Sequence, residues 1–165
     1  MLYDIYGLSL GRDEATIEGF LRHFCDRYSI EPLVDNWLQV RANEKYQIPE
    51  VELPLHSIAE LIEYGINNPT HQFNFYNQTA LRPDIHTVFL NFTYDSKVVF
   101  GISIYETTDY GEDNFPRACA IEEEIIHVTH SYKSFIAVEY PPADDEKEFD
   151  ADILVWQNMR DEYSK

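Results

Sequence analysis

The stretch TVFLNFTYDSKVVFGISIY, residues 87–105, carries the clearest structural signal in this chain. Two runs rich in β-branched and aromatic residues, Thr87–Tyr94 and Lys97–Tyr105, are joined by the polar pair Asp95 and Ser96. Runs of this composition around a short polar link are typical of a β-hairpin. Both runs are apolar on much of both faces, so we expect the hairpin to lie at the centre of its sheet.

The sequence on either side of the hairpin predicts further strands and helices. Apolar residues recur every three to four positions in three segments, which predicts helices at 14–28, 58–66 and 115–132. Asp13 and Ser57 precede the first two helices as N-cap residues, and Ser57 with Glu60 forms a capping-box pattern. Further strands are predicted at 2–10, 33–41, 71–76, 135–140 and 153–156.

These elements predict an α+β fold in which about three helices pack on a central antiparallel or mixed sheet. We expect a single domain over residues 1–165, ending in a polar tail at 157–165, because no interdomain linker is visible. The apolar content of 44%, with 12 Tyr and 10 Phe, supplies enough large side chains for one core.

The chain is strongly acidic, with 30 Asp and Glu against 12 Lys and Arg and a net charge of -18. Residues 1–82 hold 12 acids and 6 bases (net -6), and residues 83–165 hold 18 acids and 6 bases (net -12). Binding to nucleic acid or to anionic membranes depends on Lys and Arg, so this composition argues against both. The negative field is concentrated in the second half.

The cysteines and the N-terminus both favour a cytoplasmic protein. Cys25 and Cys119 are the only cysteines and form no metal-binding or CxxC pattern, so we expect free thiols in a reducing compartment. The opening MLYDIYGLSL lacks the basic region and cleavage site of a signal peptide. The longest apolar run, near Val98–Ile104, is too short to span a bilayer.

One group of residues could in principle bind a metal. Glu124, His127 and His130 are spaced by three residues and can approach one face of a helix. Di-iron carboxylate sites draw a Glu-x-x-His motif from each of two helices of a bundle together with further Glu ligands, and zincin sites need two His at i and i+4 with an intervening Glu. We therefore expect a solvated polar face here, and no metal or other cofactor. The sequence also lacks nucleophile and phosphate-binding motifs, so we expect a protein that is not an enzyme.

Two acidic tracts that contain aromatic residues are the candidate partner-binding surface. Carboxylates steer a basic partner, and aromatic rings supply contact area. The candidates in the first tract are Tyr105, Glu106, Asp109, Tyr110, Glu112 and Asp113. Those in the second are Asp144, Asp145, Glu146, Glu148 and Phe149. Both tracts are expected to be loops, and a basic protein is the expected partner.

Part of the C-terminal half resembles the immunity proteins of bacterial polymorphic-toxin and contact-dependent growth inhibition systems. The resemblance rests on the strand pair VFLNF (88–92) and KVVFGISI (97–104) with its Gly-Ile-Ser core, the helix that follows, and FIAVEYPP (135–142) before an acidic run with Phe149. It covers about a third of the chain.

The resemblance implies a small cytoplasmic protein that binds and neutralises a cognate toxin domain, often a basic nuclease. Two alternatives share the same charge: a nucleic-acid mimic that inhibits a nucleic-acid-binding protein, and an acidic adaptor or scaffold module. A metal-dependent enzyme is the least favoured alternative.

Overall fold

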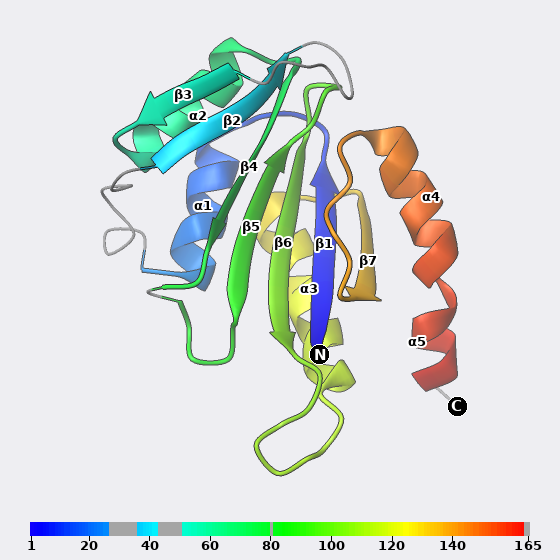
Figure 1. Ribbon diagram of the computed structural model, residues 1–165. Helices are drawn as coiled ribbons and strands as arrows, with labels where there is room; N and C mark the ends of the chain where they lie inside the picture. The colour runs from blue at the N-terminus through cyan, green and yellow to red at the C-terminus, as the bar shows by residue number, and fades with distance from the viewer. Residues whose placement is uncertain (27–35, 43–50, 80, 164–165) are drawn as a thin grey trace.

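The predicted hairpin occupies the middle of a seven-stranded sheet in the computed structural model (Figure 1). The structure describes residues 1–26, 36–42, 51–79 and 81–163. Strands β5 (Thr87–Phe92) and β6 (Val98–Tyr105) are joined by a turn in which the Lys97 amide donates to Thr93 Oγ1 at 2.9 Å. Ser96 in this turn has a left-handed backbone, with φ of 68°.

The sheet is antiparallel throughout its described pairs, in the order β3-β2-β4-β5-β6-β1-β7. The first strand of the chain therefore lies between two strands from its second half. The remaining strands are β1 (Leu2–Ser9), β2 (Asn36–Ala42), β3 (Val51–Leu55), β4 (His71–Asn77) and β7 (Lys133–Val138). The α+β prediction and its antiparallel alternative are confirmed.

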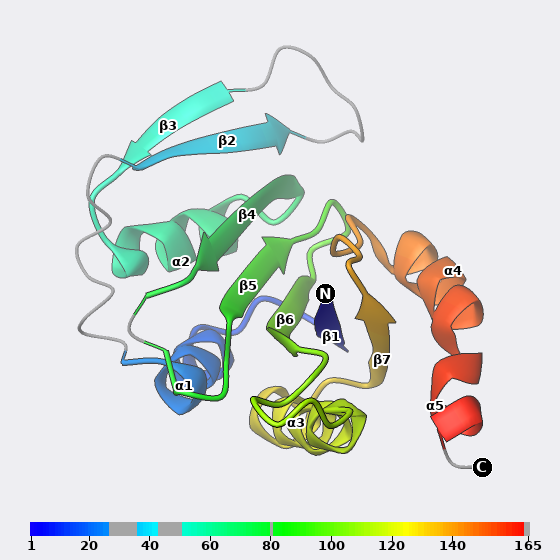
Figure 2. The ribbon, with the colours of Figure 1, turned by 60° about the horizontal axis from the view of Figure 1, so that its bottom comes forward.

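One face of the sheet carries the main core, together with α1 (Glu14–Phe24), α2 (Ile58–Asn67) and α3 (Phe115–Thr129). Figure 2 shows α1 and α3 on this side of the sheet. Phe20 of α1 lies on Phe100 of β6, with 4.8 Å between ring centroids. Gly65 lets α2 approach closely, because a Cβ there would lie 2.6 Å from the Phe92 ring.

The helix boundaries differ from the predicted ones by a few residues. The α1 helix ends at Phe24, because Cys25 is extended and forms an isolated bridge with Leu81; residues 27 and 28 lie outside the described part. Ser57 Oγ accepts from the Glu60 amide at 3.1 Å, as predicted, but the Glu60 carboxylate accepts from the amide of His56 at 2.9 Å. The α3 helix ends at Thr129, three residues earlier than predicted.

The predictions of a loop for the second acidic tract and of a strand at 153–156 are wrong, because the tract from Glu146 onward and the predicted strand belong to α4 (Glu146–Trp156). Asp145 caps this helix by accepting from the Glu148 amide at 2.7 Å, and acidic residues in a first turn are favoured by the helix dipole. Phe149, Ile153 and Trp156 face the sheet. Their spacing of four and three residues was a helical signal in the sequence. Part of the predicted polar tail forms α5 (Asn158–Tyr163).

Arg12 joins the ends of three elements, a role that the sequence did not indicate. Its guanidinium donates to the carbonyl oxygens of Gly65, Asn68, His71 and Thr93 at 2.6 to 2.7 Å. It also lies over the Phe92 ring, 5.2 Å from the centroid. Burial lowers the pKa of Arg12 to about 10, so it remains a cation at neutral pH.

The opposite face of the sheet is only partly covered. Tyr6, Leu8, Val99 and Phe135 form a second apolar cluster there with Phe149 of α4. Figure 2 shows α4 at one side of this face and the β2–β3 hairpin at the other. Between them the face carries mainly polar and aromatic side chains, from alternate positions of β4, β5, β6 and β1: Gln72, Asn74, Tyr76, Thr87, Phe89, Asn91, Ser103 and Asp4.

Candidate functional site

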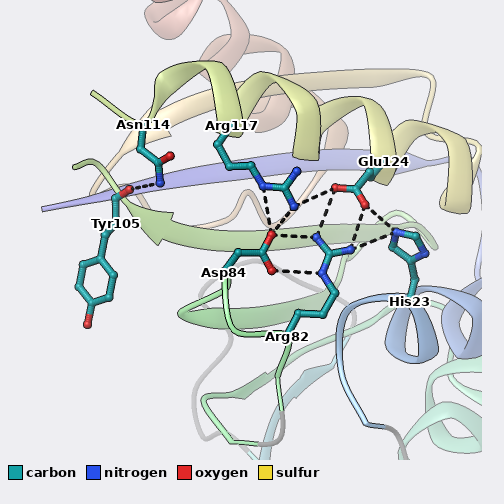
Figure 3. A network of polar contacts seen from close by, with 7 residues as sticks. All are labelled: His23, Arg82, Asp84, Tyr105, Asn114, Arg117 and Glu124. Carbon is teal, nitrogen blue, oxygen red and sulfur yellow. Dashed lines mark hydrogen bonds and ion pairs between the residues drawn. The ribbon is translucent and has the colours of Figure 1, made fainter. Parts of the chain in front are cut away.

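The first acidic tract forms an ordered loop that projects from the end of β6 (Figure 1). Hydrogen bonds across it join the Thr108 amide to the Glu112 carbonyl at 2.8 Å and the Gly111 amide to the Thr108 carbonyl at 2.9 Å. At its base, Asn114 Nδ2 donates to the Tyr105 carbonyl at 2.9 Å (Figure 3). The backbone of this loop is therefore pre-organised.

The side chains of this loop divide into structural and exposed groups. The Asp113 carboxylate accepts from the Tyr3 hydroxyl and from the Phe115 amide, both at 2.8 Å, so it holds the loop to the sheet and to α3. Tyr110 at the tip is 93% exposed. The exposed carboxylates of Asp109 and Glu112 form no hydrogen bond or ion pair with a residue in the described ranges. These two charges and the Tyr110 ring are available to a partner.

Glu106 and Tyr105 lie at the base of the same loop. The Glu106 carboxylate is 3.9 Å from the N-terminal amino group of Met1, which neutralises part of its charge. Tyr105 is exposed, and its ring meets that of His86 edge to face, with centroids 5.1 Å apart. Tyr105 therefore connects the loop with the partly covered face of the sheet.

Carboxylates of the second acidic tract bind to other groups of the same chain. Asp145 caps α4, and Glu146 pairs with Lys133 at 3.2 Å while accepting from the Tyr132 hydroxyl. The hydrogen bond from Tyr132 holds the pKa of Glu146 below its usual value, with Lys133 adding to the effect. Asp144 accepts from Asn91 Nδ2 at 3.0 Å. These carboxylates stabilise the junction of α4 with the sheet.

Two further residues of the second tract are placed differently from their predicted role. Phe149 is fully buried and packs edge to face on Phe135, with centroids 4.9 Å apart. It therefore cannot offer contact area to a partner in this conformation. Glu148 is half-buried and lines a cavity on the partly covered face.

The two predicted tracts do not form one surface. The Tyr94 amide donates to the Asp144 carbonyl at 3.0 Å, which places Asp144 beside the β5–β6 turn. The 106–113 loop leaves the opposite end of β6, which has eight residues and therefore spans roughly 23 Å. Figure 1 shows the loop and the start of α4 at opposite ends of the sheet. A partner that contacts the loop tip therefore does not need to contact α4.

A groove on the partly covered face was not predicted. It consists of two adjoining cavities of about 730 and 360 Å³, which share Tyr76, Pro141 and Pro142 as lining residues. The larger cavity lies between β4 and the β2–β3 hairpin, and it includes Asn74 and Glu148. The smaller one lies toward the 106–113 loop. The alternating sequence of β4 indicates that polar residues share one face of the strand. It does not indicate whether other elements of the fold cover that face.

The floor of the smaller cavity contains a buried carboxyl group. Asp4, 6% exposed, accepts from the Ser103 hydroxyl and from the Tyr140 amide, the latter at 2.8 Å. Burial raises the pKa of Asp4 above its usual value, although both hydrogen bonds oppose this effect. The Tyr6 hydroxyl donates to the Tyr140 carbonyl at 2.5 Å and so fixes the segment that forms one wall.

Glu124 belongs to an ion-pair network (Figure 3). Its carboxylate accepts from Arg82 at 2.9 Å and lies 2.9 Å from His23 Nε2, and the hydrogen bond from Arg82 lowers its pKa. Asp84 pairs with both Arg82 and Arg117; burial opposes its ionisation, but these hydrogen bonds hold its pKa at about 2. The charges of Arg82 and Arg117 compensate those of Asp84 and Glu124. Because His23 lies on α1 and Glu124 on α3, the network also joins these two helices to the segment before β5.

The prediction that Glu124, His127 and His130 form a solvated polar face therefore does not hold for Glu124. His127 and His130 are exposed, whereas Glu124 is engaged in the network. Among the residues that the structure describes, no group of three or more His, Cys, Asp and Glu side chains could hold a metal ion. The His23 ring meets the Phe24 ring edge to face and contacts Glu124, and Cys25 Sγ donates to the Leu21 carbonyl.

Comparisons of the chain with protein-family models, curated proteins and solved structures found no match. Within the described ranges, no helix has the length and apolar character needed to cross a membrane.

Proposed function

We propose that this chain is a cytoplasmic immunity protein that binds and neutralises a basic toxin domain, with the 106–113 loop as its principal contact. The observation that carries the proposal is the combination of a hydrogen-bonded, projecting backbone with the exposed side chains of Tyr110, Asp109 and Glu112. The resemblance of the C-terminal half to immunity proteins supports the toxin as the class of partner.

The physical chemistry of the loop suits rapid and tight binding to a concave basic surface. A pre-organised loop loses little conformational entropy on binding, which favours affinity. Charge complementarity raises the association rate, and a buried aromatic anchor slows dissociation. The net charge of -18 adds a long-range field of the same sign. Inhibition then consists of covering the toxin's active site or a nearby surface, with no catalytic step by this chain.

The placement of the acidic residues supports the nucleic-acid mimic less well than the immunity protein. Mimicry requires many solvent-exposed carboxylates along an extended surface, in place of successive phosphates. In α4 and its cap, by contrast, Asp145 is used for capping, Glu146 for an ion pair and Asp152 for a hydrogen bond from Tyr140. An acidic adaptor would use the same loop, and it differs from an immunity protein in having no toxin to neutralise.

The proposal is tested by reversing the two loop charges in Asp109→Lys/Glu112→Lys. Asp113 is left unchanged, because it holds the loop in place. The matched control is Glu123→Lys/Asp161→Lys, which alters two exposed carboxylates elsewhere and changes the total charge by the same amount. At low salt, the loop variant should associate about tenfold more slowly or worse with the toxin domain encoded by the neighbouring gene, whereas the control should change little.

A growth-protection assay completes the test. Cells that express the toxin should survive with the wild-type chain and lose protection with the loop variant. If the two double variants associate equally slowly, the effect comes from total charge and the loop is not the contact. If the wild-type chain neither binds the neighbouring gene product nor protects cells from it, the immunity function is wrong.

A further inference from the structure

The smaller cavity on the partly covered face, here called the open-face pocket, has the chemistry of a cation site. Its lining includes the carboxyl groups of Asp4 and Glu139 and the rings of Tyr76, Phe89 and Tyr140. Its described lining residues include neither Lys nor Arg. A pocket of about 360 Å³ falls within the size range of small-ligand sites.

The carboxyl group of Asp4 retains capacity for a ligand, although the residue is only 6% exposed. One oxygen accepts from the Ser103 hydroxyl and the other from the Tyr140 amide. A carboxylate offers about four acceptor positions, so both oxygens can accept a further donor. At the pocket edge, Glu139 Oε1 accepts from the Leu2 amide at 2.8 Å, and Glu139 Oε2 can accept from a ligand.

The aromatic rings add a second attraction for a cation. Tyr76 is 67% exposed, and Phe89 lies directly across from it in the β4–β5 register. The faces of such rings attract a cation through their quadrupole, and a guanidinium also stacks on them as a plane. An anion would meet the carboxyl groups of Asp4 and Glu139, and His86 is the one basic side chain among the described lining residues, so the pocket favours a cation over an anion.

The pocket lies next to the proposed contact loop. Leu2, which lines the pocket, is directly across from Tyr105 in the β1–β6 register, and the Glu106 amide donates to the Met1 carbonyl at 3.2 Å. His86 lines the pocket, and its ring meets the Tyr105 ring. A protein bound at the base of the loop can therefore place a side chain in the pocket.

We propose that the open-face pocket binds an arginine side chain of the protein partner, between the rings of Tyr76 and Phe89 and with its guanidinium directed at Asp4 and Glu139. This inference rests on the proposed function for the identity of the partner, but the chemistry of the pocket can be tested without it. Arginine is favoured over lysine because its planar group offers five donors and stacks on aromatic rings.

The test uses N-acetyl-arginine methylamide as the probe and its citrulline analogue, in which a neutral urea group replaces the guanidinium, as the control ligand. Both are titrated to tens of millimolar into isotopically labelled protein, and amide and carboxyl chemical shifts are followed by NMR. We expect saturable shifts at pocket residues with the arginine probe alone. The pKa of the Asp4 carboxyl, which burial raises, should fall when the probe is bound.

Three variants separate binding from structure. Asp4→Asn and Tyr76→Ala should each weaken the probe at least about fivefold, since each removes a direct contact. Tyr76→Ala changes an exposed side chain and should fold normally, so it keeps the test valid if Asp4→Asn disturbs the hydrogen bond from Tyr140. Tyr110→Ala, outside the pocket, should bind the probe as the wild type does.

Equal shifts with citrulline, no saturable shift, or unchanged binding in Tyr76→Ala would overturn the arginine pocket. If that happens while the loop reversals still slow toxin association, the proposed function stands and only the pocket inference fails. If the probe binds but no neighbouring toxin does, the pocket is real and the immunity function is wrong.

Discussion

The replacement Phe149→Ala tests whether the second acidic tract belongs to the core or to a contact surface. The Phe149 side chain is fully buried against Phe135, and α4 has few other buried side chains to hold it on the sheet. Truncating a buried Phe to Ala costs about 3 to 5 kcal/mol, from lost apolar transfer and from the cavity left behind. In a domain of this size that loss lowers the midpoint of thermal unfolding by roughly 6 to 20 °C.

Urea and thermal unfolding followed by circular dichroism measure this loss. The matched control is Tyr110→Ala, which removes another aromatic ring from an acidic tract, but one that is 93% exposed. Its stability should stay within about 0.5 kcal/mol of the wild type, while its complex with the proposed toxin partner should dissociate faster. A loss below about 1 kcal/mol for Phe149→Ala would refute the placement of α4 against the sheet.

Two further replacements probe buried and partly exposed charges. Arg12→Met keeps an apolar stem over Phe92 but removes the donors to four carbonyl groups, so it should lower the free energy of unfolding by at least about 2 kcal/mol in urea denaturation. An unchanged urea midpoint would contradict the role of Arg12 in joining α2, β4 and β5. The pKa of Glu124 is lowered in the folded state. Its contribution to stability is therefore fully present above pH 4.5, the usual pKa of the group, and is lost as the pH falls through the lowered pKa. Glu124→Gln should therefore flatten the fall of stability with acid, at a cost below about 1 kcal/mol at neutral pH because the network is partly exposed; an acid profile identical to the wild type would contradict this.

The part of the fold that local pattern determines was predictable. The hairpin, the three helices on the core face and the caps at Asp13 and Ser57 follow from periodicity and side-chain chemistry within a few residues. The region after Pro142 was mispredicted because its charge outweighed its periodicity. Phe149, Ile153 and Trp156 have helical spacing, but the acidic residues between them resemble a solvated loop.

The candidate surface was only half predictable, for a related reason. Both acidic tracts combine several carboxylates with an aromatic residue, and composition does not show which carboxylates acquire internal partners. Lys133 reaches Glu146 from β7, and Asn91 reaches Asp144 from β5, over sequence separations that no local pattern encodes. The 106–113 loop kept Asp109 and Glu112 exposed because its turn is closed by its own backbone.

The sequence by itself determined an acidic α+β chain with a central hairpin, since hydrophobic period, turn chemistry and net charge are properties of neighbouring residues and of composition. Tertiary structure decided which residues meet: Arg12 with the ends of α2, β4 and β5, Glu124 with Arg82, and Asp4 with Ser103. It also decided that one sheet face stays partly open beside the loop. The physical reason is that strand order places β1 between β6 and β7, and the pairs across these strands join residues 89 to 135 positions apart, from Ser9–Val98 to Tyr3–Val138.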